Sequence, residues 1–133
     1  MKVIVAGCVA VTVFDVGGAL ISKATGFAYE FFGIGCLSTF CAIGVFAARR
    51  GTLASAAAAG LIVALYDATV CWWIAWQIGP GRIDVSEGTT AAVAVPLTAM
   101  FAVSVNTAMS IGAAAVWQKL RERRQAGSGQ GSD

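Results

Sequence analysis

The chain has 133 residues, about the length of one domain, and 58% of them are hydrophobic while only 12% are charged. Soluble domains average about 45–50% apolar and about 25% charged residues, so this chain has too few charged side chains to cover a water-facing surface. The net charge of +2 is too small to indicate a nucleic-acid partner, and the absence of histidine removes the commonest haem ligand and proton shuttle.

Four apolar stretches follow one another along the chain, at about 3–22, 27–48, 53–78 and 90–117. A bilayer core about 30 Å thick is crossed by roughly 20 helical residues, and each stretch reaches that length. Transmembrane β-strands are shorter and alternate polar with apolar residues, which these stretches do not do. The sequence therefore predicts an all-α, polytopic integral membrane protein.

The connections between the stretches are short, and the last one contains the turn signal Gly79-Pro80-Gly81. Short connections place consecutive helices side by side in opposite directions, so we expect a four-transmembrane-helix antiparallel bundle. Residues 1–124 should form this single membrane domain. The Gly/Ser-rich residues 125–133 should form a disordered tail.

Basic residues are distributed unevenly between the two ends of the predicted bundle. One end would carry Lys2, Arg49, Arg50, Lys119, Arg121, Arg123 and Arg124. The other would carry only Lys23 and Arg82. Because basic residues near helix ends are enriched on the cytoplasmic side, we expect a multi-pass protein of the cell membrane with both termini in the cytoplasm.

Small residues recur at every fourth position in the predicted helices. The third helix carries Ala56, Gly60, Ala64 and Ala68. The fourth carries Ala94, Thr98, Ala102, Asn106, Ser110 and Ala114, and the first has Cys8, Thr12, Asp15 and Ala19 along one face. Small residues let membrane helices approach closely, so these stripes predict packing faces. The alternative is that alanine and glycine are simply frequent in this sequence.

Asp15 and Asp67 are the most informative polar residues, because each lies inside an apolar stretch. An aspartate at the centre of a membrane helix costs about 2.5–3.5 kcal/mol, so each should face the bundle or a water-filled cavity. Counting from the helix ends places both in the outer half of the membrane. Two roles remain open: a hydrogen-bonded tie between helices, or a carboxyl group that carries protons.

Three further polar residues complete the candidate intramembrane site. Lys23 and Glu30 lie nearer the outer interface, where they would either pair or extend to the headgroups. Asn106 lies in the predicted inner half, and we expect it to make an interhelical hydrogen bond.

The cysteines and the remaining sequence provide no recognisable catalytic motif. Cys8, Cys36, Cys41 and Cys71 lie in apolar stretches without the paired spacing of metal ligands. No nucleophile–base pair or phosphate-binding loop is present. The sequence predicts a protein that is not an enzyme, without a cofactor or a metal site.

The segment Asp15-Val16-Gly17-Gly18-Ala19-Leu20, followed by Lys23 and Gly26-Phe27, resembles the first helix of small multidrug-resistance transporters. That family is also short and four-spanning, and it couples export to protons through an acidic residue in this helix. The resemblance implies that Asp15 would be the coupling carboxylate, although the family normally has glutamate there. It covers residues 15–27 only.

Two functional hypotheses follow. The first is a non-enzymatic accessory or structural membrane component, and the alternative is a proton- or cation-coupled small transporter that uses Asp15 and Asp67. The expected partners are the lipid bilayer and either a second copy of the chain or another membrane protein. The hypotheses differ in whether the two aspartates meet at a water-filled cavity or bond separately to neighbouring helices.

Overall fold

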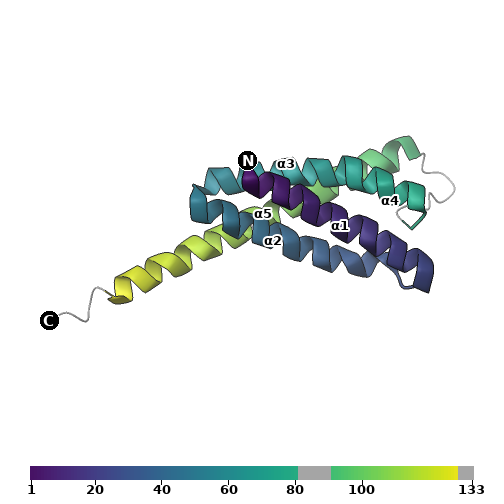
Figure 1. The fold of residues 1–133 in the computed structure, drawn as a ribbon. Helices are drawn as coiled ribbons and strands as arrows, with labels where there is room; N and C mark the ends of the chain where they lie inside the picture. Colours follow the sequence, from purple (N-terminus) through teal and green to yellow (C-terminus); the bar gives the residue numbers. More distant parts are fainter. Residues whose placement is uncertain (81–90, 129–133) are drawn as a thin grey trace.

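The computed structural model describes residues 1–80 and 91–128, and within these ranges the chain forms helices and no strand. The elements are α1 (Lys2–Thr25), η1 (Tyr29–Phe31), α2 (Phe32–Arg50), α3 (Leu53–Tyr66), the π-helical η2 (Asp67–Cys71), α4 (Trp72–Ile78) and α5 (Ala91–Ser128) (Figure 1). The α3, η2 and α4 elements form one continuous span. The prediction of an all-helical chain with four helices long and apolar enough to cross a membrane is confirmed for the described residues.

The structure differs from the predicted bounds mainly in α5. This helix continues past the apolar stretch to Ser128, so residues 125–128, expected in the tail, are helical. Residues 129–133 lie outside the described part of the chain, as do residues 81–90 with Arg82. The first three spans end within three residues of the predicted bounds, but α2 begins only at Phe32, after η1, whereas the predicted stretch begins at residue 27.

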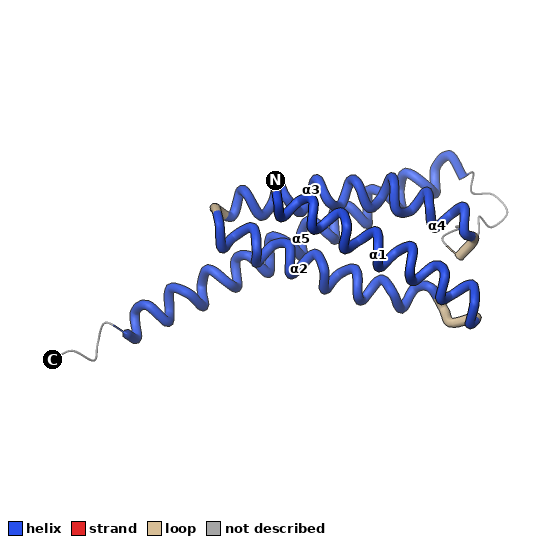
Figure 2. The backbone as a smooth tube through the Cα atoms, viewed as in Figure 1, coloured by secondary structure: helices blue, strands red, loops and turns tan. Residues whose placement is uncertain are grey.

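The helix ends follow from local residue chemistry. Gly26 ends α1 in the left-handed region, with φ of 72°, and its N–H donates to the carbonyl of Ser22. Thr52 caps α3, because its side chain accepts a hydrogen bond from the backbone N–H of Ser55 at 3.3 Å. These two sharp turns allow α2 to return beside α1 and α3 to return beside α2 (Figure 2).

The tightest helix crossing joins α5 to α2 and α3. A Cβ atom at Gly44 would collide with the backbone carbonyl of Ser110, and one at Gly60 would lie 2.6 Å from the Cβ of Ser110. The Ser110 hydroxyl donates to the carbonyl of Ala56 at 3.2 Å. Glycine and serine therefore bring three backbones together where larger side chains would separate them.

The stripe on α3 lies against this crossing. Ala56 and Ala64 are fully buried, Gly60 is buried and Ala68 is partly buried. The stripe on α5 is divided: Asn106, Ser110 and Ala114 are buried, Ala94 and Ala102 are partly buried, and Thr98 is exposed. Only the middle of α5 makes the close crossing.

Large apolar side chains cover the outside of the helices. Ile34 and Leu97 are each 66% exposed and Phe101 is 69% exposed, whereas the core contains mostly small side chains around Phe40 and Val63. An apolar surface this extensive is unfavourable in water and suits contact with lipid chains.

Basic residues gather at one end of the molecule. Lys2 and Arg50 line the same groove between the start of α1 and the α2–α3 turn. The Arg49 guanidinium lies 4.4 Å from the ring centroid of Trp117 and so joins α2 to α5. The basic C-terminal part of α5 projects beyond this same end (Figure 1), whereas Lys23 lies in the last turn of α1 at the other end.

Candidate functional site

Polar side chains from all four spans meet in the middle of the molecule. We refer to them as the central polar cluster, which consists of Thr12, Asp15, Cys36, Tyr66, Asp67, Cys71 and Asn106. All of its members are buried or partly buried, so their polar groups need partners within the protein.

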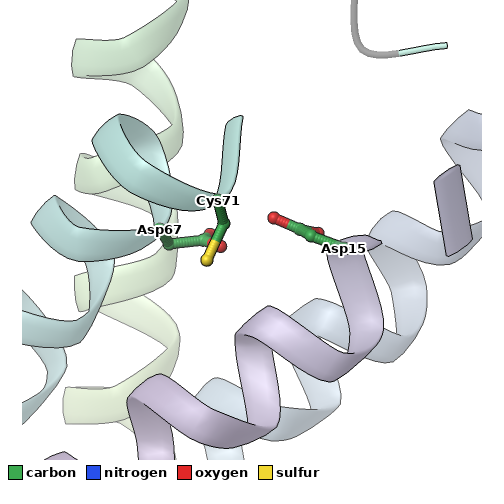
Figure 3. Close-up of side chains that lie close together, drawn as sticks. All are labelled: Asp15, Asp67 and Cys71. Carbon is green, nitrogen blue, oxygen red and sulfur yellow. The ribbon is translucent and has the colours of Figure 1, made fainter. Parts of the chain in front are cut away.

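Asp15, Asp67 and Cys71 form the centre of the cluster. One potential ligand atom from each side chain lies within 4.8 Å of the other two. Figure 3 shows the Asp15 carboxylate on α1 pointing toward the Asp67 carboxylate and the Cys71 thiol. The two aspartates singled out in the sequence are therefore brought together, although they belong to different spans.

The π-helical turn η2 begins at Asp67 and ends at Cys71. In a π-helix the hydrogen bonds run from residue i to i+5, so the turn is wider than in an α-helix. Both side chains project from this turn toward α1 (Figure 3). Single π-turns inside α-helices occur frequently at functional sites, and this one lies where the two carboxyl groups meet.

The two oxygens of Asp67 have different surroundings, although the whole side chain is only 8% exposed. Oδ2 accepts a hydrogen bond from Nδ2 of Asn106 at 3.3 Å and one from the Cys36 thiol at 3.7 Å. Oδ1 is buried and has no hydrogen-bond partner. A buried oxygen without a partner is uncommon and requires an explanation, such as a bound proton, ion or water.

On the α1 side, Asp15 is partly buried and has Asp67 and Tyr29 as polar neighbours. One turn earlier, the Thr12 hydroxyl donates to the carbonyl of Cys8 at 2.7 Å. The same oxygen lies 3.1 Å from the Tyr66 hydroxyl and 3.4 Å from the Cys71 sulfur. These contacts join α1 to the α3–η2 span one turn before Asp15.

The other candidate residues are placed differently. Asn106 makes an interhelical hydrogen bond, and its partner is Asp67. Lys23 and Glu30 are both exposed and do not belong to the cluster. Within the described residues, no basic side chain is among the groups that interact with either aspartate.

Sequence reasoning missed Cys36, Tyr66 and Cys71 as members of the cluster. The search for paired cysteines could not find them, because the cluster combines single residues from separate spans. Two signals were available: Cys71 lies four residues after Asp67, on the same side of a helix, and Thr12 shares the predicted face of Asp15.

Two carboxylates this close in an apolar setting repel each other strongly when both are ionised. They are compatible with burial when they share a proton or when a cation lies between them. The arrangement can therefore hold and release one or more positive charges.

Three grooves on the described surface lie away from this centre. One of about 500 Å³ runs between α1 and α2 near Ala6 and Phe46, and another of about 440 Å³ lies between α4 and α5 near Trp73. The third lies at the basic end of the molecule. Neither aspartate lines any of these three grooves. The two carboxyl groups therefore approach each other at a place outside the grooves.

None of the family models, curated proteins and solved structures compared with this chain matches it. The likeness of residues 15–27 to small multidrug-resistance transporters therefore remains a local resemblance.

Proposed function

We propose that this chain is a multi-pass integral membrane protein that binds a proton or another small cation at Asp15 and Asp67 and couples that binding to transport. The helices would form an antiparallel bundle with both termini in the cytoplasm. Four apolar spans, the exposed apolar side chains and the basic residues at one end support this placement.

The convergence of Asp15 and Asp67 carries the proposal. A residue that only ties two helices together needs one hydrogen-bonding group, and serine or asparagine supplies it at a lower desolvation cost than a carboxylate. Placing a second acid beside the first adds repulsion unless a positive charge is bound. A pair of acids is therefore an expensive structural tie but a suitable site for a cation that must bind and leave.

A second candidate is a non-enzymatic structural or accessory component, whose partner would be a second copy of the chain or another membrane protein. The hydrogen bond from Asn106 to Asp67 and the position of the three grooves away from both aspartates favour it. In this role the cluster would hold the four helices together without exchanging ions.

Ion flux in liposomes separates the two candidates. We expect the parent protein to move protons or cations under an imposed pH gradient, and Asp15→Asn and Asp67→Asn to remain folded but to lose that flux, because an amide cannot take up and release a proton. Glu30→Gln, an exposed acid outside the cluster, is the matched control and should retain the flux. A parent protein that moves no ions would exclude the transporter role and favour the structural one.

A further inference from the structure

We propose that Asp15, Asp67 and Cys71 form a binding site for a divalent transition-metal ion of the Zn²⁺ class. The inference rests on the proposed function to the extent that it names the cation taken up at the same carboxyl pair. It also stands as a binding property, whether or not the ion is transported.

The donor set selects the class of ion. Thiolate and carboxylate groups are both common zinc ligands, with Zn–S bonds of about 2.3 Å and Zn–O bonds of about 2.0 Å. A thiolate is a poor ligand for Mg²⁺ and Ca²⁺, which prefer oxygen. One sulfur with two carboxylates therefore favours zinc and its chemical relatives, such as Co²⁺ and Cd²⁺.

The spacing of the donors fits an ion between them. In a tetrahedral zinc site these bond lengths place neighbouring donor atoms roughly 3.3–3.6 Å apart. The donor atoms of Asp15, Asp67 and Cys71 all lie within 4.8 Å of one another. Closing around an ion requires movements of about 1 Å, which side-chain torsions can supply without moving a helix.

The unpartnered Oδ1 of Asp67 points to a bound cation, which is either a proton shared with Asp15 or a metal ion in its place. The side chain is only 8% exposed, its Oδ2 is held by Asn106 and Cys36, and its Oδ1 has no hydrogen-bond partner. Figure 3 shows this carboxylate directed toward Asp15 and Cys71. Carboxylates that bind metals are typically oriented by hydrogen bonds from a second layer of residues, and Asn106 occupies that position here.

Charge balance makes the binding dependent on pH. The ion would displace the Cys71 thiol proton and the proton shared by the two carboxyl groups, and both protons would leave to water. No basic side chain interacts with either aspartate among the described residues, so no positive charge of the protein competes with the ion. Because protons and metal compete for the same donors, affinity should fall as the pH is lowered.

Co²⁺ titration of the purified full chain in detergent tests the site, because a cobalt–thiolate bond gives a near-ultraviolet charge-transfer band. We expect one Co²⁺ per chain with this band, displaced by Zn²⁺. Cys71→Ser should remove the band, and Asp15→Asn should weaken binding at least about tenfold. Cys41→Ser is the matched control: this cysteine lies on α2 outside the cluster and its loss should change neither property.

Binding of Co²⁺ without a thiolate band, or a band that survives in Cys71→Ser, would overturn the proposal. If Cys71→Ser does not fold, the Co²⁺ affinity of Asp15→Asn tests the site instead. A Co²⁺ affinity equal to that of the parent protein would exclude the site. Proton flux measured with EDTA present separates this proposal from the previous one. Flux without Co²⁺ binding rejects only the metal site, whereas Co²⁺ binding without any ion flux rejects only transport.

Discussion

The Asp67 side chain separates two tasks between its two oxygens. Oδ2 accepts hydrogen bonds from Asn106 and Cys36, which fix the orientation of the carboxylate, while Oδ1 is buried without a hydrogen-bond partner. A buried carboxylate of this kind is retained only if the surrounding contacts offset its desolvation. Asn106 is thus expected to stabilise the fold and to position the site at the same time.

The residue-scale prediction concerns Asn106→Leu. This change removes the Asn106 N–H that donates to Oδ2 of Asp67, so that the Cys36 thiol remains as the donor to that oxygen. We therefore expect the free energy of unfolding to fall by about 0.6–1.7 kcal/mol. Ser104→Ala is the matched control, because the exposed Ser104 hydroxyl bonds only to the carbonyl of Met100 on its own helix. Unfolding in mixed detergent micelles measures both variants. Equal stability of Asn106→Leu and the control would contradict this role of Asn106.

The sequence predicted the level of these residues along the bundle only coarsely. Asp67 was placed in the outer half and Asn106 in the inner half, yet their side chains form a hydrogen bond and so lie at nearly the same level. Each residue lies within three residues of the midpoint of its predicted stretch, so the count puts the two residues on opposite sides of the middle but close together. Hydropathy alone does not fix how far a long helix slides along its neighbours.

At the scale of elements, the sequence predicted the four helices well, because each apolar stretch is long enough to span a bilayer. It did not predict η2, since residues 67–71 contain neither glycine nor proline to mark a change of helix type. It also ended the fourth helix at Trp117, where hydropathy falls. The following Gln, Lys, Leu, Arg and Glu residues are all good helix formers, so the helix continues although the apolar stretch has ended.

The element-scale prediction tests the crossing of α3 and α5. Gly60→Leu should lower the free energy of unfolding by about 1–3 kcal/mol, because the side chain would be forced against Ser110. Gly60→Ala should be milder, since a single methyl group needs only a small separation of the helices. Gly112→Leu is the control, because a Cβ at Gly112 meets nothing within 4 Å. A thermal midpoint of Gly60→Leu equal to that of Gly112→Leu would mean that the two helices do not meet at Gly60.

At the scale of the whole molecule, polarity is arranged in three zones. Basic residues occupy one end, apolar side chains cover the outside of the spans, and the central polar cluster lies between the helices. The first two zones were visible in the sequence, because charge and hydropathy vary along the chain. The third was not, because it depends on which faces of four separate helices meet.

The whole-molecule prediction concerns orientation. Lys2, Arg49 and Arg50 lie at the same end as the basic part of α5, and positive residues next to a span are retained on the cytoplasmic side. A cysteine introduced at Ser86, in the third connection, should therefore react with a membrane-impermeant thiol reagent in intact cells. A cysteine introduced at Ser128 should react only after the membrane is opened.

The unmodified chain is the control, because its four cysteines lie in apolar spans and should remain unlabelled. Labelling of Ser128→Cys but not Ser86→Cys in intact cells would reverse the orientation, and labelling of both would show that the chain does not cross the membrane four times.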